Sequence, residues 1–189
     1  MPVFIDNQKV EFFSECNTNA TFPSPSDSPR RGSAKIDMIY PQVSFPSNKV
    51  FQAVGEKAIR ALVREHHELV RRSNIGHLYP KEEKAFDEAT RIIEDFFVQM
   101  LGGADIYTSS RGHPQLRNRH FPFEIDEEGR DIWLMCFKKA LKKSDFPHEF
   151  LAEIWDWVEA LSLRLVNRRT TMAELKRYPY EKISQYFKN

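Results

Sequence analysis

Residues 102–123 read GGADIYTSSRGHPQLRNRHFPF, and this stretch decides how the chain is interpreted. Two prolines limit its local structure, because a residue that precedes proline is pushed away from the α conformation. The segment between those limits fits one short helix, from Pro114 to His120. The rest of the stretch fits no regular helix, so a short helix inside an irregular segment is predicted.

His120 lies in the last turn of this short helix, four residues after Leu116, so the two side chains share a face. Arg117 and Arg119 flank that face. Imidazole is a suitable iron ligand, and its other ring nitrogen can donate to a carbonyl near Leu116. His120 is therefore a candidate metal ligand beside an anionic group. The alternative is an exposed helix terminus that the helix dipole stabilises.

Four longer segments repeat their apolar residues at helical spacing, and no segment shows convincing strand alternation. The second is the clearest, with Ala89, Ile93 and Phe96 on one stripe. The chain is therefore predicted to be all-α. The first predicted helix runs from Ser47 to about Arg72, and the second from Tyr79-Pro80 to Gly102-Gly103. The third begins at Asp126-Glu127, and the fourth begins somewhere between Asp145 and Pro147.

The two ends of the chain differ from this helical middle. Six of the 11 prolines lie in the first 48 residues, and residues 16–32 are rich in Ser, Asn, Thr and Pro. We expect a flexible arm over residues 1–46, whose last part runs extended along the domain surface. A globular domain over 47–170 and a C-terminal helical extension over 171–189 follow.

Composition excludes several classes of protein. Lys plus Arg is 28 and Asp plus Glu is 27, which argues against nucleic-acid binding through bulk charge. Two cysteines exclude a disulfide framework. No apolar run approaches the roughly 20 residues of a membrane helix, and the first residues do not read as a secretory signal. The expected location is therefore cytoplasmic.

The residues of the irregular stretch closely resemble the group II truncated haemoglobins, in order and in spacing. The resemblance covers roughly residues 49 to 168 and includes the Gly102-Gly103 pair. It implies an all-α truncated globin, a two-over-two helical sandwich, with N-terminal and C-terminal extensions and one haem b (iron protoporphyrin IX). The matching residues are Tyr107, Arg111-Gly112-His113-Pro114, Leu116-Arg117, Arg119-His120, Pro122-Phe123 and Arg130-Asp131-Ile132-Trp133-Leu134.

The resemblance also implies roles for single residues. His120 matches the proximal haem ligand, Trp133 the distal tryptophan whose indole N–H donates to an iron-bound ligand, and Tyr79 the aromatic residue over the haem. The family usually has a distal tyrosine on the first long helix. His67 is assigned to that place here, and His66 is the alternative one residue away. The other residues assigned to the haem are Ala89, Ile93, Phe96 and Leu116 on its faces, and Tyr107, His113 and Arg117 near its propionates.

Neighbouring helical residues point about 100° apart. One of His66 and His67 is therefore expected to face inward and the other outward. Trp155 continues the apolar stripe of the fourth helix and is expected inward, whereas Trp157, two residues further, is expected at a rim or on a partner. An inward histidine with an ordinary pKa near 6.5 predicts a distal hydrogen bond that changes between about pH 5.5 and 7.5.

Three functional classes follow. The first, which we expect, is a haem protein that binds O₂, CO or NO at a five-coordinate, histidine-ligated iron. The second is an enzyme that uses the same haem for peroxide reduction or nitric oxide dioxygenation, with a reductase as partner. The third is a haem-free helical interaction module, which leaves the Arg, His and Pro residues of the irregular stretch unexplained.

Overall fold

The computed structural model of the chain describes residues 40–171 and 173–188. Within these residues every regular element is a helix, which confirms the all-α prediction. The part of the predicted arm before residue 40 lies outside the described residues. The elements are α3 (Lys49–Arg71), η2 (Gly76–Leu78), α4 (Glu83–Met100), α5 (Ile106–Arg111), α6 (Leu116–His120), α7 (Glu127–Lys143), α8 (His148–Leu163), α9 (Tyr180–Ile183) and η3 (Ser184–Phe187).

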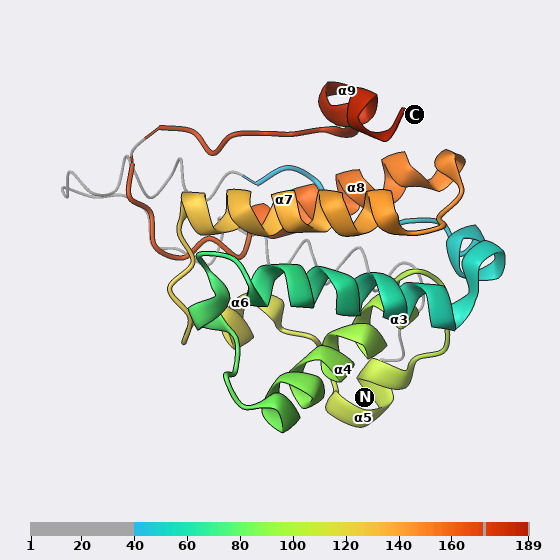
Figure 1. Cartoon of the computed structure of the whole chain (residues 1–189), viewed down its shortest axis with the longest axis horizontal. Helices are drawn as coiled ribbons and strands as arrows, with labels where there is room; N and C mark the ends of the chain where they lie inside the picture. Colours follow the sequence, from blue (N-terminus) through green and yellow to red (C-terminus); the bar gives the residue numbers. More distant parts are fainter. Residues whose placement is uncertain (1–39, 172, 189) are drawn as a thin grey trace.

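The four long helices form two layers (Figure 1). α7 and α8 run side by side in one layer, and α3 lies against α7 from the other. α4 packs on α3 and carries α5 beside it. Because α3 is contacted by both α4 and α7, side chains on two of its faces are enclosed. Among the described residues no helix has both the length and the apolar composition needed to cross a bilayer.

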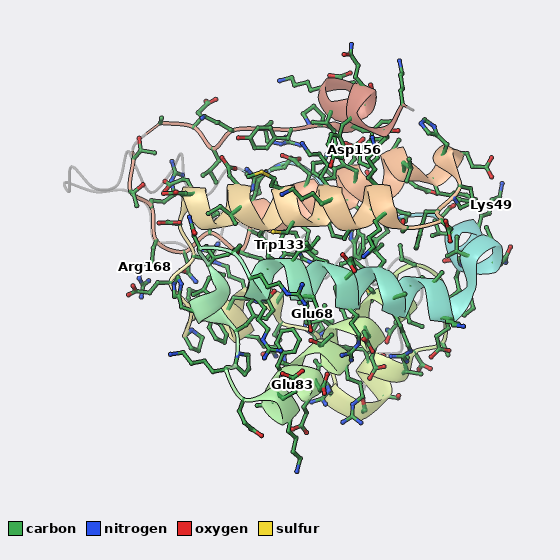
Figure 2. The ribbon with its side chains drawn as sticks, in the orientation of Figure 1. Lys49, Glu68, Glu83, Trp133, Asp156 and Arg168 are labelled. Atoms are coloured by element: carbon green, nitrogen blue, oxygen red, sulfur yellow. The ribbon has the colours of Figure 1, made fainter. Side chains whose placement is uncertain are left out.

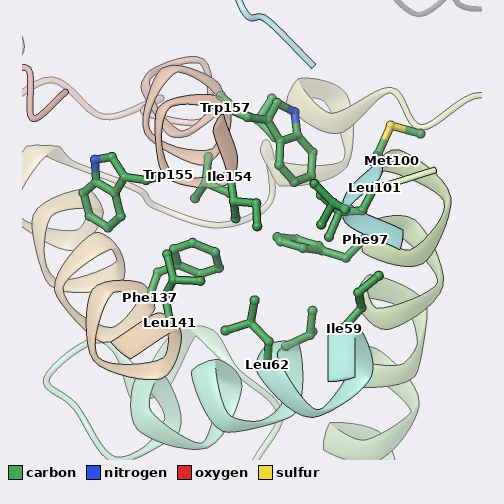
Figure 3. Packing of buried hydrophobic residues seen from close by; sticks show 14 of the residues in the cluster. Ile59, Leu62, Phe97, Met100, Leu101, Phe137, Leu141, Ile154, Trp155 and Trp157 are labelled. Carbon is green, nitrogen blue, oxygen red and sulfur yellow. The ribbon is translucent and has the colours of Figure 1, made fainter. Parts of the chain in front are cut away.

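The hydrophobic core lies where these four helices meet (Figure 3). Ile59 from α3, Phe137 from α7 and Ile154 from α8 are completely buried there, and Phe97 from α4 is nearly so. Such burial removes apolar surface from water and is the main force that holds the layers together.

The expectation that only one of the two α8 tryptophans faces inward is wrong. Trp155 is 2% exposed and Trp157 is 1% exposed. Figure 3 shows them on different sides of α8, and both sides are covered. Trp155 packs on Phe137, at 6.3 Å between ring centroids, while Trp157 packs on Phe97 at 5.1 Å and on Phe45 at 6.4 Å. The segment before α3 covers Trp157 through Phe45, a contact that the periodicity of α8 alone cannot predict.

The start of α4 and the existence of α5 also differ from expectation. α4 begins at Glu83 rather than at Tyr79-Pro80. Glu82 is still extended, with φ −74° and ψ 131°, so the helix begins only after it. α5 has only six residues, too few for an apolar period to appear in the sequence.

Two further helix starts come later than predicted. α3 follows Asn48 rather than Ser47. α6 begins at Leu116 rather than Pro114 because Gln115 is left-handed, with φ 43° and ψ 45°.

The two remaining ends described here follow the predicted signals. Asp126 precedes α7, and its carboxylate accepts a hydrogen bond from the Gly129 N–H at 2.7 Å. Gly102, just after α4, has φ +106°, a conformation that favours glycine. These two ends fix where the irregular stretch leaves α4 and where α7 begins.

The described segment before α3 is extended and packs on the helical domain. Val43 is buried, and the Arg164 guanidinium donates to the Pro41 carbonyl at 2.8 Å. This agrees with the expected course along the domain surface.

The C-terminal extension is joined to α7 and α8 by a buried ion cluster. Arg130 is 2% exposed and donates to the Glu159 carboxylate at 2.8 Å. Glu159 is completely buried and also accepts from Arg177 at 2.9 Å and from the Tyr178 backbone N–H at 3.1 Å. Each charge in the cluster has a partner, so it acts as a structural attachment for the extension.

Candidate functional site

His120 ends α6, and its ring is held by its own helix. Nδ1 lies 2.6 Å from the Leu116 carbonyl oxygen. A carbonyl only accepts, so Nδ1 carries the proton and Nε2 keeps its lone pair. Nε2 makes no hydrogen bond with any residue that the structure describes. Burial lowers the pKa of His120, which keeps the ring neutral. This is the form of histidine that binds a metal ion through Nε2.

The backbone after His120 is fixed by a residue of the segment that follows α8. The Asn167 side-chain amide donates to the His120 carbonyl and to the Phe123 carbonyl, each at 2.9 Å. The same side chain accepts from the Ile125 N–H at 3.1 Å. Phe121 and Phe123 are 48% and 42% exposed, so apolar surface remains uncovered beside His120. Asn167 thus holds in place a segment that has little packing of its own.

On α3, both His66 and His67 are buried, at 2% and 3% exposed. The expectation that one of them faces outward is wrong, because α3 lies between α4 and α7. His67 turns to α4, where Nδ1 lies 3.1 Å from the Thr90 hydroxyl. His66 turns to α7, where Nε2 lies 3.3 Å from the Trp133 carbonyl. The two side chains point about 100° apart, and each direction meets a neighbouring helix, so neither side chain reaches solvent.

Tyr79 and Trp133 complete an aromatic group around these histidines. The His67 and Tyr79 ring centroids are 5.1 Å apart, and those of His66 and Trp133 are 4.5 Å apart. Burial raises the pKa of Tyr79 to about 12, so the phenol stays protonated. A hydrogen bond from the Trp133 indole acts on this pKa in the opposite direction but is the smaller effect. Figure 2 shows Trp133 between α7 and α3. Three polar side chains predicted for the distal side, those of His67, Tyr79 and Trp133, are thus brought together.

The pKa values of the two histidines differ from the expectation. Burial, and then the nearby Arg64 charge, lower the pKa of His67 to about 3. Burial also holds the pKa of His66 well below its ordinary value. Both rings are therefore neutral near pH 7. The predicted titration between pH 5.5 and 7.5 assumed a solvated imidazole, and burial removes it.

The remaining predicted residues fall on α4, α5 and α6. Ala89 and Ile93 of α4 are half-buried and Phe96 is buried. Tyr107 of α5 is 2% exposed, with its ring centroid 5.5 Å from that of Phe96. Leu116, the first residue of α6, is buried as well.

Arg117 and His113, assigned to the propionates by resemblance, have different surroundings. The Arg117 guanidinium donates to the Tyr40 hydroxyl at 2.6 Å and to the Arg164 carbonyl at 2.9 Å. It therefore joins α6 to the segment before α3 and to the end of α8. His113 lies half-buried in the turn between α5 and α6.

Two residues of this site were missed in the sequence. Phe86 and Thr90 are both completely buried on α4. Phe86 packs near His67, at 6.4 Å between ring centroids, and Thr90 bonds to the same histidine. They are four residues apart, a helical spacing that the sequence does show, but they lie one position beyond the stripe that includes Ala89. The sequence feature that could have indicated this role is the Thr90 hydroxyl at helical spacing from the apolar Phe86.

The donor set can be tested against a metal cofactor. No cluster of three or more His, Cys, Asp or Glu side chains that could hold an ion occurs among the described residues. Among these residues His120 is therefore not part of a multi-ligand ion site. A neutral His120 with a free Nε2 lone pair fits the single protein ligand that haem iron takes.

Comparisons with known proteins agree with this geometry. A family model described as bacterial-like globin matches residues 49–167. Group 2 truncated hemoglobin YjbI of Bacillus subtilis (strain 168) is 33% identical over 121 residues, which cover 64% of this chain and 90% of that relative. The crystal structure of phosphate-bound Hell's gate globin IV is 42% identical, with a TM-score of 0.80, and the match covers 88% of this chain and 100% of that one. A truncated oxygen-avid haemoglobin from Bacillus subtilis is 32% identical, with a TM-score of 0.58 over 62% of this chain and 98% of that one.

Proposed function

The chain belongs to the bacterial-like globin family, among the group II truncated haemoglobins, and from that premise we propose that it binds haem b through His120 and holds a diatomic ligand on the opposite side of the iron. The observation that carries this proposal is the distance of 2.6 Å from Nδ1 of His120 to the Leu116 carbonyl oxygen, which fixes the tautomer of the ring. Its Nδ1 proton is directed to the Leu116 carbonyl, which leaves Nε2 for the iron.

The bound haem supplies an iron atom that can take O₂, CO or NO as its sixth ligand. Around it we place Ala89, Ile93 and Phe96 of α4 on one side of the ring and Leu116 of α6 beside His120. Their burial or half-burial gives the apolar lining that a flat macrocycle needs. Ala89 is small and leaves room above the iron.

The distal side is assigned to His67, Tyr79 and Trp133. All three are neutral polar side chains near pH 7, and each carries one N–H or O–H donor, that of the Trp133 indole being directed at the Tyr79 hydroxyl. A donor directed at iron-bound O₂, which carries partial negative charge, slows its release. Between the two histidines the geometry favours His67. The ring N–H of His66 is already directed to the Trp133 carbonyl, whereas His67 lies beside Tyr79.

We favour ligand binding over peroxide chemistry for a specific reason. A peroxidase needs a base near the iron to accept a proton from peroxide. His67 is the candidate base, and a pKa of about 3 makes it a weak proton acceptor. The similarity to a truncated oxygen-avid haemoglobin from Bacillus subtilis supports O₂ as the ligand. The iron is proposed to be five-coordinate when no ligand is present.

We assign this function to a domain of residues 47–170, with residues 1–46 and 171–189 as additions to it. The family model ends at residue 167. The similarity to Hell's gate globin IV covers a larger share of the chain, 88%, so it reaches beyond that match.

Absorption spectroscopy of the purified chain tests the proposal. We expect a Soret band, a five-coordinate ferrous spectrum, and separate spectra for the O₂ and CO forms. A chain that takes up no haem would instead be the haem-free interaction module. A haem-loaded chain whose ferrous form is six-coordinate would contradict the proposed open site.

A further inference from the structure

The Thr90 side chain has one hydrogen-bond partner among the residues that the structure describes. Its side chain is completely buried, and its hydroxyl oxygen lies 3.1 Å from Nδ1 of His67. A hydroxyl can either donate its proton or accept one, so the distance alone leaves two arrangements. They differ in which ring nitrogen of His67 carries the proton.

Proton accounting separates the two arrangements. If Nδ1 carried the proton and Thr90 accepted it, the hydroxyl proton would be buried with no acceptor. Buried polar groups are almost always paired, because an unpaired one loses its hydrogen bond to water without replacement. If Thr90 donates to Nδ1, the hydroxyl proton and Nδ1 are both paired, and the one donor left over is the Nε2–H of His67, whose ring is 3% exposed whereas Thr90 is completely buried. A neutral His67 then carries its one proton on Nε2.

We propose that Thr90 is a positioning residue, which fixes His67 as the Nε2–H tautomer and thereby keeps the sixth position of the iron open. This inference rests on the proposed haem function. An Nε2 atom that carries a proton has no lone pair for iron, so His67 can donate to a bound ligand but cannot replace it. Nε2 itself makes no hydrogen bond with the described residues, so its N–H remains available.

Two features of the site support this assignment. The Tyr79 and Phe86 rings enclose the His67 ring, at 5.1 and 6.4 Å between centroids, which limits its rotation. Thr90 and Ala89 are adjacent on α4, so the helix that is proposed to leave room above the iron also carries the group that orients His67. A change at Thr90 therefore acts on the ligand through His67.

The test compares Thr90→Val, which removes the hydroxyl at nearly constant shape, with Thr90→Ser, which keeps it. The His67 ring nitrogens are observed by ¹⁵N NMR in the full chain, both haem-free and in the diamagnetic ferrous CO form. The parent and Thr90→Ser are expected to show the Nε2–H tautomer. In Thr90→Val we expect the population of the Nδ1–H tautomer to rise about tenfold, with a matching rise in six-coordinate ferric haem. Thr108→Val, which removes a hydroxyl that bonds to Gln99 instead, is the control and should change neither signal.

An Nδ1–H tautomer of His67 in the parent would overturn the inference. So would Thr90→Val and Thr90→Ser shifting the tautomer equally, because the hydroxyl would then have no role. If the chain bound no haem, the proposed function would fail by itself. The tautomer measured in the haem-free chain would still confirm or overturn the role of Thr90.

Discussion

His120 and His67 carry the same ring in two regions of the molecule, and the contact at Nδ1 gives them opposite properties. On the short helix α6, the Leu116 carbonyl accepts from His120, so Nε2 keeps a lone pair. On the long helix α3, His67 meets the Thr90 hydroxyl, which can donate to it. The first ring is suited to bind iron and the second to face a ligand on iron. One hydrogen-bond partner thus decides what a neutral histidine offers.

The two regions also differ in how they are held. His67 is enclosed by α3, α4 and the Tyr79 ring. His120 ends a helix of five residues and is followed by exposed phenylalanines, so it depends on the Asn167 side chain for its backbone position. The proximal side should therefore be sensitive to single hydrogen bonds, and the distal side to protonation.

Acid should produce the largest effect on stability, and it acts on the distal side. The pKa of His67 is about 3 in the folded chain and near 6.5 when unfolded, so the unfolded chain binds more protons between these values. The contribution of neutral His67 to the free energy of unfolding is therefore fully present above pH 6.5, and it decreases as the pH falls toward 3. At pH 5 the loss is about 2 kcal/mol from His67, and His66 adds to it in the same direction. Denaturant unfolding between pH 7.5 and 5 measures this loss.

His67→Gln should reduce that pH dependence, and His148→Gln, at an exposed histidine, should leave it unchanged. The same low pKa implies that O₂ dissociation stays constant between pH 5.5 and 7.5. A kinetic transition in that window that disappears in His67→Tyr would show that His67 titrates near its ordinary pKa. The distal side would then be solvated rather than buried.

Removing the Trp133 indole donor should have the next largest effect. Trp133→Phe keeps most of the apolar ring and loses the N–H. A hydrogen bond to a partly charged ligand contributes about 1.5 kcal/mol or more, so O₂ dissociation should accelerate about tenfold or more. Trp155→Phe is the matched control, because the Trp155 indole donates to the Tyr178 carbonyl instead. Equal rates in the parent and Trp133→Phe would reduce Trp133 to a packing role.

A smaller effect is expected on the proximal side from Asn167→Ala. This change removes donors to the His120 and Phe123 carbonyls, partly exposed bonds that together contribute about 1 kcal/mol. Haem loss should accelerate several-fold while O₂ dissociation changes little. Asn118→Ala, at an exposed residue of α6, is the control. If Asn167→Ala altered O₂ dissociation more than haem loss, the proposal that the His120 region controls haem retention and the His67 region controls the ligand would be wrong.

Much of this arrangement could be predicted from the sequence. Apolar spacing gave the four long helices, and the interval of four residues gave the contact between His120 and Leu116. The pattern of one helix cannot show how many neighbours it has. The burial of both His66 and His67, and of both α8 tryptophans, was therefore missed. The pairing of Thr90 with His67 joins two helices, so no local spacing signals it.

Haem ligation by His120 is the central claim, and the ferrous spectrum of His120→Gly tests it most directly. The account predicts that the variant loses haem or the five-coordinate histidine spectrum, and that free imidazole restores that spectrum by occupying the vacated position. Full haem occupancy with an unchanged ferrous spectrum in His120→Gly, without imidazole, would contradict the account. His113 would then become the next candidate ligand.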